Sequence, residues 1–69
     1  MPYINVKIAK VEGSNGLSAD GKSDLIEKIT AAVESVTGRP RNLTMVLIEE
    51  VEAENWGIGG VSADKLSLK

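Results

Sequence analysis

Residues 43–51 read LTMVLIEEV, and this stretch decides the fold. Its centre, MVLI, places apolar residues on both faces of a β-strand, a pattern typical of a strand that is covered on two sides. Such a strand needs a helix against one face and a second cover against the other. The neighbouring segments show which of these covers the chain itself supplies.

A helix is predicted directly before this strand. Ser18 is suited to cap its first turn, and Gly38, followed by residues 39–40 (Arg-Pro), ends it. Between these ends, apolar residues recur at helical spacing and form one stripe. They are Leu25, Ile26, Ile29, Val33 and Val36. This helix supplies one of the two covers.

A first strand is predicted over residues 3–9, YINVKIA, because apolar and polar residues alternate there. Pro2 directly precedes it, a position that suits a residue without an N–H to give to the sheet. Residues 10–17 read as a glycine-containing loop. The sequence therefore predicts one α/β domain over residues 1–69, a short β-α-β unit with parallel strands and a right-handed crossover.

This unit cannot complete its own core. Two strands leave two open edges, and one helix covers one face of the sheet. A domain below about 70–80 residues usually needs a staple or a partner, but the chain has 69 residues, no cysteine and no histidine. Disulfides are excluded and the usual zinc and copper ligands are missing. We therefore expect the chain to associate with further chains.

Charge and composition exclude several classes of function. The net charge is −2 and the eight basic residues are spread along the chain, which argues against a nucleic-acid interface. No hydrophobic run reaches transmembrane length and no secretion signal precedes the first strand, so a cytoplasmic protein without membrane contact is predicted. No acidic loop has the spacing of a magnesium or calcium site. No metal site is expected.

The loop after the second strand, residues 52–60, contains the sequence NWGIGG. Its glycines lack the GxGxxG spacing and the strand-to-helix context of a phosphate loop. A tight hairpin, or a close backbone approach at a subunit interface, explains them better. Trp56 is the only tryptophan, and from the residues alone it is either a core or interface plug or the wall of a substrate pocket. Residues 61–69 show no clear pattern.

Together these features resemble the 4-oxalocrotonate tautomerase family over essentially the full chain. They are Pro2 at the start of a strand, the β-α-β order, the IEE ending of the second strand (48–50) and the NWGIGG loop. The resemblance implies a cofactor-independent isomerase whose N-terminal proline, freed by removal of Met1, is the general base. It also implies a homohexamer of three dimers, with four-stranded sheets backed by helices, and a substrate pocket lined by Trp56.

The chemistry of a prolyl amine suits this role. An α-amino group titrates near ~7.7–8.0 in model peptides, and a secondary amine is intrinsically more basic. Burial among apolar groups lowers this pKa, so a pocket can hold Pro2 neutral near pH 7, where it works as a general base. Moving a proton from an enol oxygen, or from a carbon beside a carbonyl, to another position is a tautomerisation. The step needs no metal and no organic cofactor.

Two positions depart from the family pattern. Members that act on dicarboxylates carry an arginine after the first loop's glycine and another in the second strand, but here Leu17 and Met45 stand there. Neither can grip a carboxylate as a guanidinium does. Arg39, Arg41 and Lys22 are candidate substitutes, and each is also explained as a solvated surface cation. The predicted substrate is a small enol or unsaturated keto acid with less charge than a dicarboxylate.

Two alternatives stay open. Some members of the family assemble unlike chains, so this chain is either a self-associating enzyme or a weakly active or non-catalytic structural subunit of a hetero-oligomer. A proline-based hydrolytic reaction, such as dehalogenation of a small unsaturated acid, would share the base. It would also need a residue that positions water, and the sequence offers no clear candidate for that residue.

Overall fold

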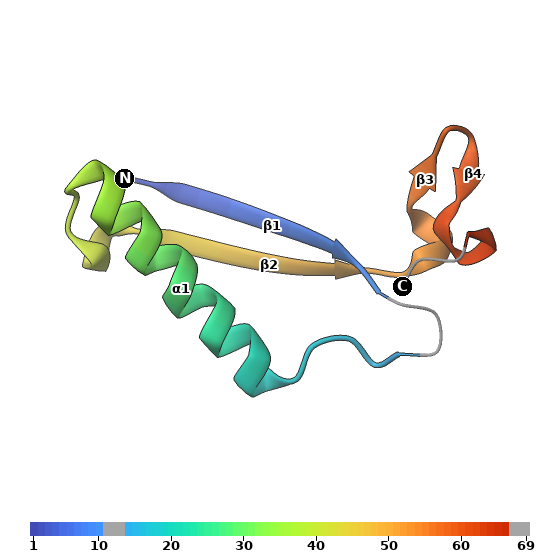
Figure 1. The fold of residues 1–69 in the computed structure, drawn as a ribbon, viewed down its shortest axis with the longest axis horizontal. Coiled ribbons are helices and arrows are strands. Elements are labelled where there is room, and N and C mark those ends of the chain that lie inside the picture. The colour runs from blue at the N-terminus through green and yellow to red at the C-terminus, as the bar shows by residue number, and fades with distance from the viewer. Residues whose placement is uncertain (11–13, 67–69) are drawn as a thin grey trace. The chain divides into compact units, whose positions relative to one another are not determined.

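The computed structural model describes residues 1–10 and 14–66, and Figure 1 shows its elements. Two longer strands flank one helix in the chain, and a small hairpin follows. The elements are β1 (Tyr3–Ala9), α1 (Ala19–Thr37), β2 (Met45–Val51), β3 (Gly57–Ile58) and β4 (Val61–Ser62), with 3-10 turns at Arg41–Leu43, Ala53–Asn55 and Ala63–Lys65. β1 and β2 form a parallel pair. The predicted β-α-β fold is confirmed.

The chain divides into two compact units, which are described separately. The first holds residues 1–6 and 17–48, and so contains α1 and the beginnings of both long strands. The second holds residues 7–16 and 49–69, with the strand ends and the β3–β4 hairpin. Part of the predicted loop, residues 11–13, lies outside the described residues. The expectation that residues 1–69 act as one domain stays a prediction.

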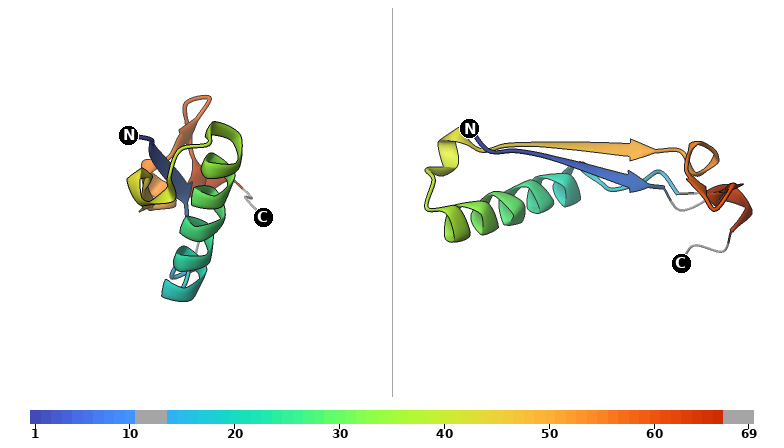
Figure 2. Two further views of the ribbon diagram at one scale, coloured as in Figure 1. Left: turned by 90° about the vertical axis from the view of Figure 1, so that its left-hand side faces the viewer. Right: turned by 90° about the horizontal axis from the view of Figure 1, so that it is seen from above.

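Helix α1 has the two ends that the sequence predicts. The Ser18 hydroxyl accepts a hydrogen bond from the Gly21 amide at 3.0 Å, which satisfies one of the free donors of the first turn. At the other end Gly38 has a φ of 72° and donates its amide to the Glu34 carbonyl at 2.9 Å. Within the first unit, α1 lies along one face of the two strands (Figure 2).

Hydrogen bonds at both ends of the parallel pair fix its register. The Met45 amide donates to the Pro2 carbonyl at 2.9 Å, and the Lys10 amide donates to the Val51 carbonyl at 2.9 Å. In a parallel ladder a residue bonds to the two residues that flank its neighbour on the other strand. Both bonds therefore show that neighbouring residues of β1 and β2 differ by 42 in number. The ion-paired Lys10 and Glu52 have the same separation. Each residue of β1 therefore lies beside the residue 42 positions later, and Pro2 lies beside Thr44.

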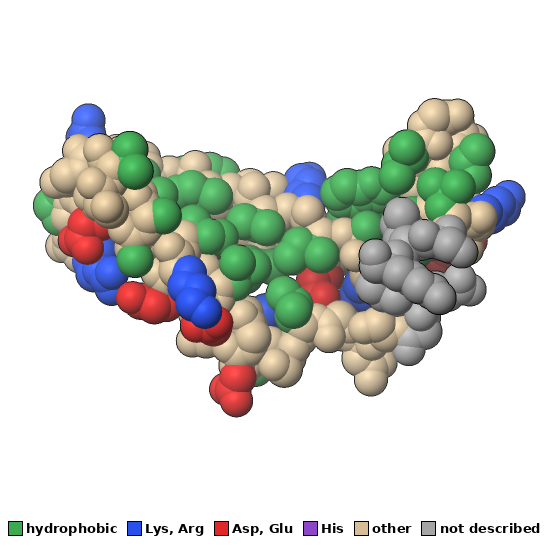
Figure 3. All heavy atoms as spheres, in the orientation of Figure 1, with side chains coloured by type: hydrophobic (Ala, Val, Ile, Leu, Met, Phe, Trp, Pro, Cys, Tyr) green, Lys and Arg blue, Asp and Glu red, His purple; other side chains and the backbone are tan. Residues whose placement is uncertain are grey.

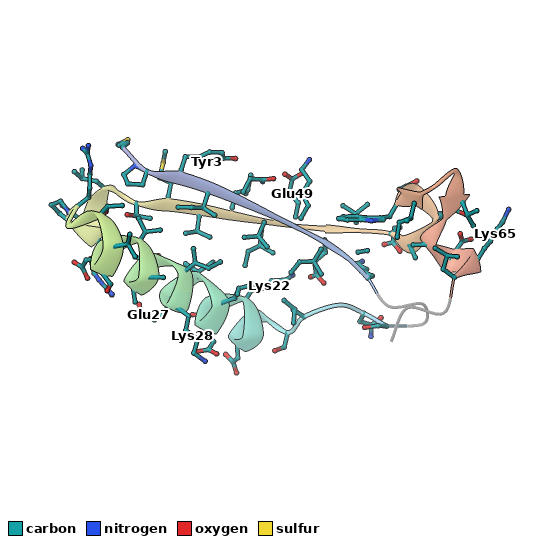
Figure 4. All side chains as sticks on the ribbon, turned by 45° about the horizontal axis from the view of Figure 1, so that its top comes forward. Tyr3, Lys22, Glu27, Lys28, Glu49 and Lys65 are labelled. Carbon is teal, nitrogen blue, oxygen red and sulfur yellow. The ribbon has the colours of Figure 1, made fainter. Side chains whose placement is uncertain are left out.

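The two faces of the pair differ in the first unit. Ile4, Val6, Val46 and Ile48 are half-buried on the face that α1 covers. The alternate residues Tyr3, Met45 and Leu47 are exposed by 57, 50 and 46 %, and Tyr3 projects from β1 away from α1 in Figure 4. We call these three side chains the open sheet face. The helix covers one face of β2, as predicted, and within the first unit the other face stays exposed.

The described residues contain little fully buried apolar surface. Their buried hydrophobic residues are Ala53 and Ala63, and α1 buries no residue completely. Figure 3 shows hydrophobic side chains at the surface over the strands. The predicted helix stripe is also partly open, since Val36 at its end is 85 % exposed. A single chain therefore leaves much of its apolar surface in water, as expected for a subunit of an assembly.

The second strand begins later than the sequence predicts. Leu43 and Thr44 were expected in a strand over residues 43–51, but β2 begins at Met45. The φ of Pro40 is −58°, and its carbonyl accepts the Leu43 amide at 3.1 Å, so residues 41–43 form a 3-10 turn. The strand prediction was wrong at this end because the turn that follows the helix uses these residues.

The glycine-rich loop folds as the predicted hairpin. Gly57 pairs with Ser62 and Ile58 pairs with Val61. Gly59 and Gly60 join the two short strands with φ values of 60° and 87°, which side-chain-bearing residues rarely adopt.

No helix in the described part of the chain is long and apolar enough to cross a membrane.

Candidate active site

Pro2 precedes β1 in the first unit and is half-buried. Its carbonyl accepts the Met45 amide at 2.9 Å, so the residue is anchored to β2 by its backbone. The N-terminus lies near the turn between α1 and β2 in both Figure 1 and Figure 2. With Met1 attached, the Pro2 nitrogen is an amide without a basic lone pair. Only a chain without Met1 presents an amine at this position.

Thr44 is the direct neighbour of Pro2 across the ladder. Its hydroxyl oxygen exposes less than 1 Å² and has no hydrogen-bond partner in the structure. A buried polar group without a partner is rare and unfavourable. From the sequence, Thr44 received no separate role, because it was counted only as part of the strand predicted over residues 43–51. The register, which places it beside Pro2, is the signal that identifies it.

Arg41 lies in the turn before β2 and contacts two carboxylates of α1. Its Nη1 lies 3.1 and 3.2 Å from the two carboxylate oxygens of Glu27, and its Nε lies 3.3 Å from Glu34 Oε1. The hydrogen bond with Glu27, and then that with Glu34, raises the pKa of Arg41 above its ordinary value. Any bound anion would have to compete with two carboxylates for this guanidinium.

Arg39 lies between the helix and this turn and is exposed. Its backbone amide donates to the Thr37 hydroxyl at 3.1 Å, which ties the backbone after the helix to the last residue of α1. Among residues 1–10 and 14–66, no ion pair involves its guanidinium. Arg39 is therefore better placed than Arg41 to offer charge to a ligand.

Trp56 belongs to the second unit. It follows the 3-10 turn Ala53–Asn55 and is half-buried. Its carbonyl accepts the Ala63 amide, which ties the segment before the hairpin to the segment after it. Backbone hydrogen bonds therefore hold Trp56 both to the turn before it, at Ala53, and to the segment after the hairpin, at Ala63. The structure places Pro2, Arg39 and Arg41 together in the first unit, and Trp56 in the second.

The two positions where the family pattern has arginine are apolar and exposed. Leu17 is 40 % exposed and Met45 is 50 % exposed, and Met45 is part of the open sheet face. No group of three or more His, Cys, Asp or Glu side chains in the described part of the chain is arranged to hold a metal ion. The chemistry available in the first unit is therefore a prolyl nitrogen that becomes an amine only when Met1 is removed, a buried hydroxyl, and the cations Arg39 and Arg41.

A small parallel β-α-β unit with Pro2 directly before its first strand defines the class of the protein, and comparison with known sequences gives the family. Residues 2–65 match the Tautomerase family, described as tautomerase enzymes, and the chain belongs to this family. The 2-hydroxymuconate tautomerase of Comamonas testosteroni is 41 % identical over 66 residues, which cover 96 % of this chain and 97 % of that protein.

Solved structures agree with this assignment. A structure from the characterisation of 4-oxalocrotonate tautomerase isozymes of Methylibium petroleiphilum has a TM-score of 0.82 and 36 % identity, covering 97 % of this chain and 100 % of that one. A heterohexamer 4-oxalocrotonate tautomerase from Chloroflexus aurantiacus has a TM-score of 0.80 and 24 % identity, covering 96 % of this chain and 98 % of that one. At that identity the second likeness shows the fold alone. Family membership supports an isomerase of the tautomerase type.

Proposed function

We propose that this protein is a cofactor-independent tautomerase whose general base is the amine of Pro2 after Met1 is removed. The observation that carries the proposal is that the family match begins at residue 2, the residue directly before β1. The carbonyl of Pro2 is held by Met45, so the adjoining amine would have a fixed place at the start of the sheet. Pre-positioning of this kind is what a general base requires.

The proposed reaction moves one proton and leaves the total charge unchanged. The neutral amine of Pro2 takes the proton from the enol hydroxyl, and the oxygen lone pair forms the carbonyl as the carbon–carbon double bond shifts. The resulting ammonium gives its proton to a carbon of the same substrate, which restores the free amine. No oxidant, reductant or leaving group is involved.

The remaining site residues have proposed roles that differ in strength. Trp56 would supply an apolar wall of the substrate pocket. Arg39, which is exposed and forms no ion pair in the described part of the chain, is the preferred cation for a substrate carboxylate. Arg41 is the weaker candidate because Glu27 and Glu34 already neutralise it.

The proposed substrate is a small enol or unsaturated keto acid that carries less charge than a dicarboxylate. A relative at 41 % identity is a 2-hydroxymuconate tautomerase, which supports an enol substrate for this chain as well. Leu17 and Met45, however, offer no charge at the positions where the family pattern places arginines. Without guanidiniums there, a second carboxylate gains little from binding.

We also propose self-association, in the form of a homohexamer of three dimers with four-stranded sheets. It is supported by the open sheet face and by the small amount of fully buried apolar surface in the described residues. Each chain would act as one domain over residues 1–69, in the cytoplasm. The second candidate function is a structural subunit that assembles with an unlike chain, and the apolar residues at Leu17 and Met45 favour it. A stable homohexamer from the purified chain supports the enzyme, whereas aggregation without a partner supports the subunit.

Substitution of Pro2 by alanine tests the proposal. The variant Pro2→Ala keeps an amine at nearly the same place but changes its basicity and its backbone freedom. We expect the rate of ketonisation of a simple enol such as phenylenolpyruvate to fall substantially while the sedimentation coefficient stays that of the wild type. Full activity in the variant, with removal of Met1 verified by intact mass, would overturn the proposal.

A further inference from the structure

The hydroxyl of Thr44 is a buried polar group for which the structure shows no partner. Its oxygen exposes less than 1 Å² and makes no hydrogen bond. The backbone amide of the same residue is satisfied, because it donates to the Arg41 carbonyl at 3.1 Å. The side-chain hydroxyl is unpaired, and leaving a buried hydroxyl unpaired destabilises a fold. A native protein is expected to supply a partner.

The register places Pro2 beside Thr44, the residue that carries this hydroxyl. The bond from the Met45 amide to the Pro2 carbonyl sets Pro2 opposite Thr44, and neighbouring strands lie about 4.8 Å apart. Both residues alternate with Tyr3 and Met45 of the open sheet face, so both side chains lie on the face that α1 covers. While Met1 is attached, the nitrogen of Pro2 has no hydrogen to donate and no basic lone pair. Removal of Met1 changes both properties.

We propose that Thr44 is a positioning residue whose hydroxyl accepts a hydrogen bond from the prolyl amine that removal of Met1 creates. The inference rests on the proposed function of Pro2 and adds a partner for its nitrogen. A neutral secondary amine has one hydrogen and one lone pair. When the amine donates this hydrogen in a hydrogen bond to the Thr44 hydroxyl, its lone pair keeps a fixed direction and stays free for the substrate proton.

The same contact adjusts the basicity of the amine. A hydrogen bond from an ammonium is charge-assisted and about twice as strong as one from a neutral amine. Thr44 therefore favours the protonated form, against the effect of burial. The elements next to this site carry further titratable groups, none of which a Thr44 variant alters, so the comparison isolates the hydroxyl. They are Asp20, Lys22, Asp24, Glu27, Lys28 and Glu34 on α1, Arg39 and Arg41 after it, Tyr3 and Lys7 on β1, and Glu49 and Glu50 on β2.

The test measures the amine directly by NMR titration of chains that carry ¹⁵N-labelled proline and lack Met1. In Thr44→Val the pKa of the Pro2 nitrogen should fall by about half a unit to one unit, the size expected when a charge-assisted bond is lost. Thr44→Ser keeps a hydroxyl and should keep the wild-type value. Ser23→Ala, which removes an exposed hydroxyl from α1, is the matched control and should change nothing. An unchanged pKa in Thr44→Val overturns the proposal.

A second measurement guards against a general effect on folding. Chemical synthesis can supply the chain with and without Met1, each with threonine or valine at position 44. Valine should lower the unfolding temperature of the chain that starts at Pro2, and should leave it unchanged or raise it when Met1 is attached. An equal change in both chains would show a packing role only. Because neither readout uses activity, a fully active Pro2→Ala would refute the function and leave the contact to be judged by these results.

Discussion

Leu47→Glu is the substitution that tests most sharply whether the open sheet face is covered by other chains. Leu47 lies on β2 and is 46 % exposed, and with Tyr3 and Met45 it forms the apolar surface that α1 does not cover. If copies of the chain bury this surface, the variant places a carboxylate without a partner in an apolar contact. The variant should therefore fail to assemble.

The size of the effect follows from the exposure. Full burial of a leucine contributes about 1.5–3 kcal/mol, so covering the exposed half of Leu47 contributes about 1 kcal/mol. An unpaired buried carboxylate costs several kcal/mol more, and a symmetric contact contains the residue twice. A total of roughly 5 kcal/mol or more corresponds to weakening of the association by at least about a thousandfold.

Sedimentation velocity at micromolar concentration, with circular dichroism on the same samples, measures both assembly and folding. The wild type and Leu47→Met should sediment as multimers, and Leu47→Glu should sediment as a smaller species or lose its helix signal. Ser23→Glu adds the same charge to the exposed side of α1 and should behave as the wild type. A Leu47→Glu variant with the wild-type sedimentation coefficient, or a folded wild-type monomer, would refute the reasoning.

Three further predictions concern single residues. Met45→Arg should raise kcat/KM for a dicarboxylate enol relative to a mono-acid, with Met45→Leu as the control, and an unchanged ratio would show that this position does not meet the substrate. Gly38→Ala should lower the free energy of unfolding in urea by about 1 kcal/mol, because the φ of Gly38 is 72° and no atom crowds an added Cβ. Gly38→Asn should lower it less, and equal losses in the two variants would exclude backbone strain as the cause. The hydrogen bond with Glu52 raises the pKa of Lys10 above 10.5, so this pair stabilises the fold below pH 10.5 and the effect is lost as pH rises through the higher folded value. The difference in unfolding temperature between wild type and Lys10→Met should therefore shrink above pH 10.5, and a difference that persists there would contradict the assignment.

The sequence predicted the elements of this fold well where local chemistry decides them. The alternation of residues 3–9 gave the bounds of β1, and Ser18 and Gly38 gave the ends of α1. The start of β2 was placed two residues early because a 3-10 turn after Pro40 competes with the strand for the same residues. The hairpin at the GIGG segment was one of the two explanations that the sequence allowed, and Gly59 and Gly60 take φ values there that glycine readily adopts.

The candidate site was less predictable because it depends on contacts between distant residues. The partners of Arg41 lie 7 and 14 residues earlier in the chain, and no pattern shows that the turn directs the guanidinium back toward α1. The position of Thr44 beside Pro2 depends on the register between β1 and β2, which hydrogen bonds between residues distant in sequence define. Pro2 was proposed from its position, since a proline before a strand is visible in the sequence, and its role stays a prediction.

The proposed function requires that the amine of Pro2 is the general base, and a comparison of chains with and without Met1 tests this requirement. The ketonisation rate of phenylenolpyruvate is measured for two chains of verified intact mass, one beginning at Pro2 and one that retains Met1, at matched states of assembly. We expect the chain beginning at Pro2 to be active and the chain retaining Met1 to lose nearly all activity, because an amide nitrogen has no basic lone pair. Equal rates in the two chains would contradict it.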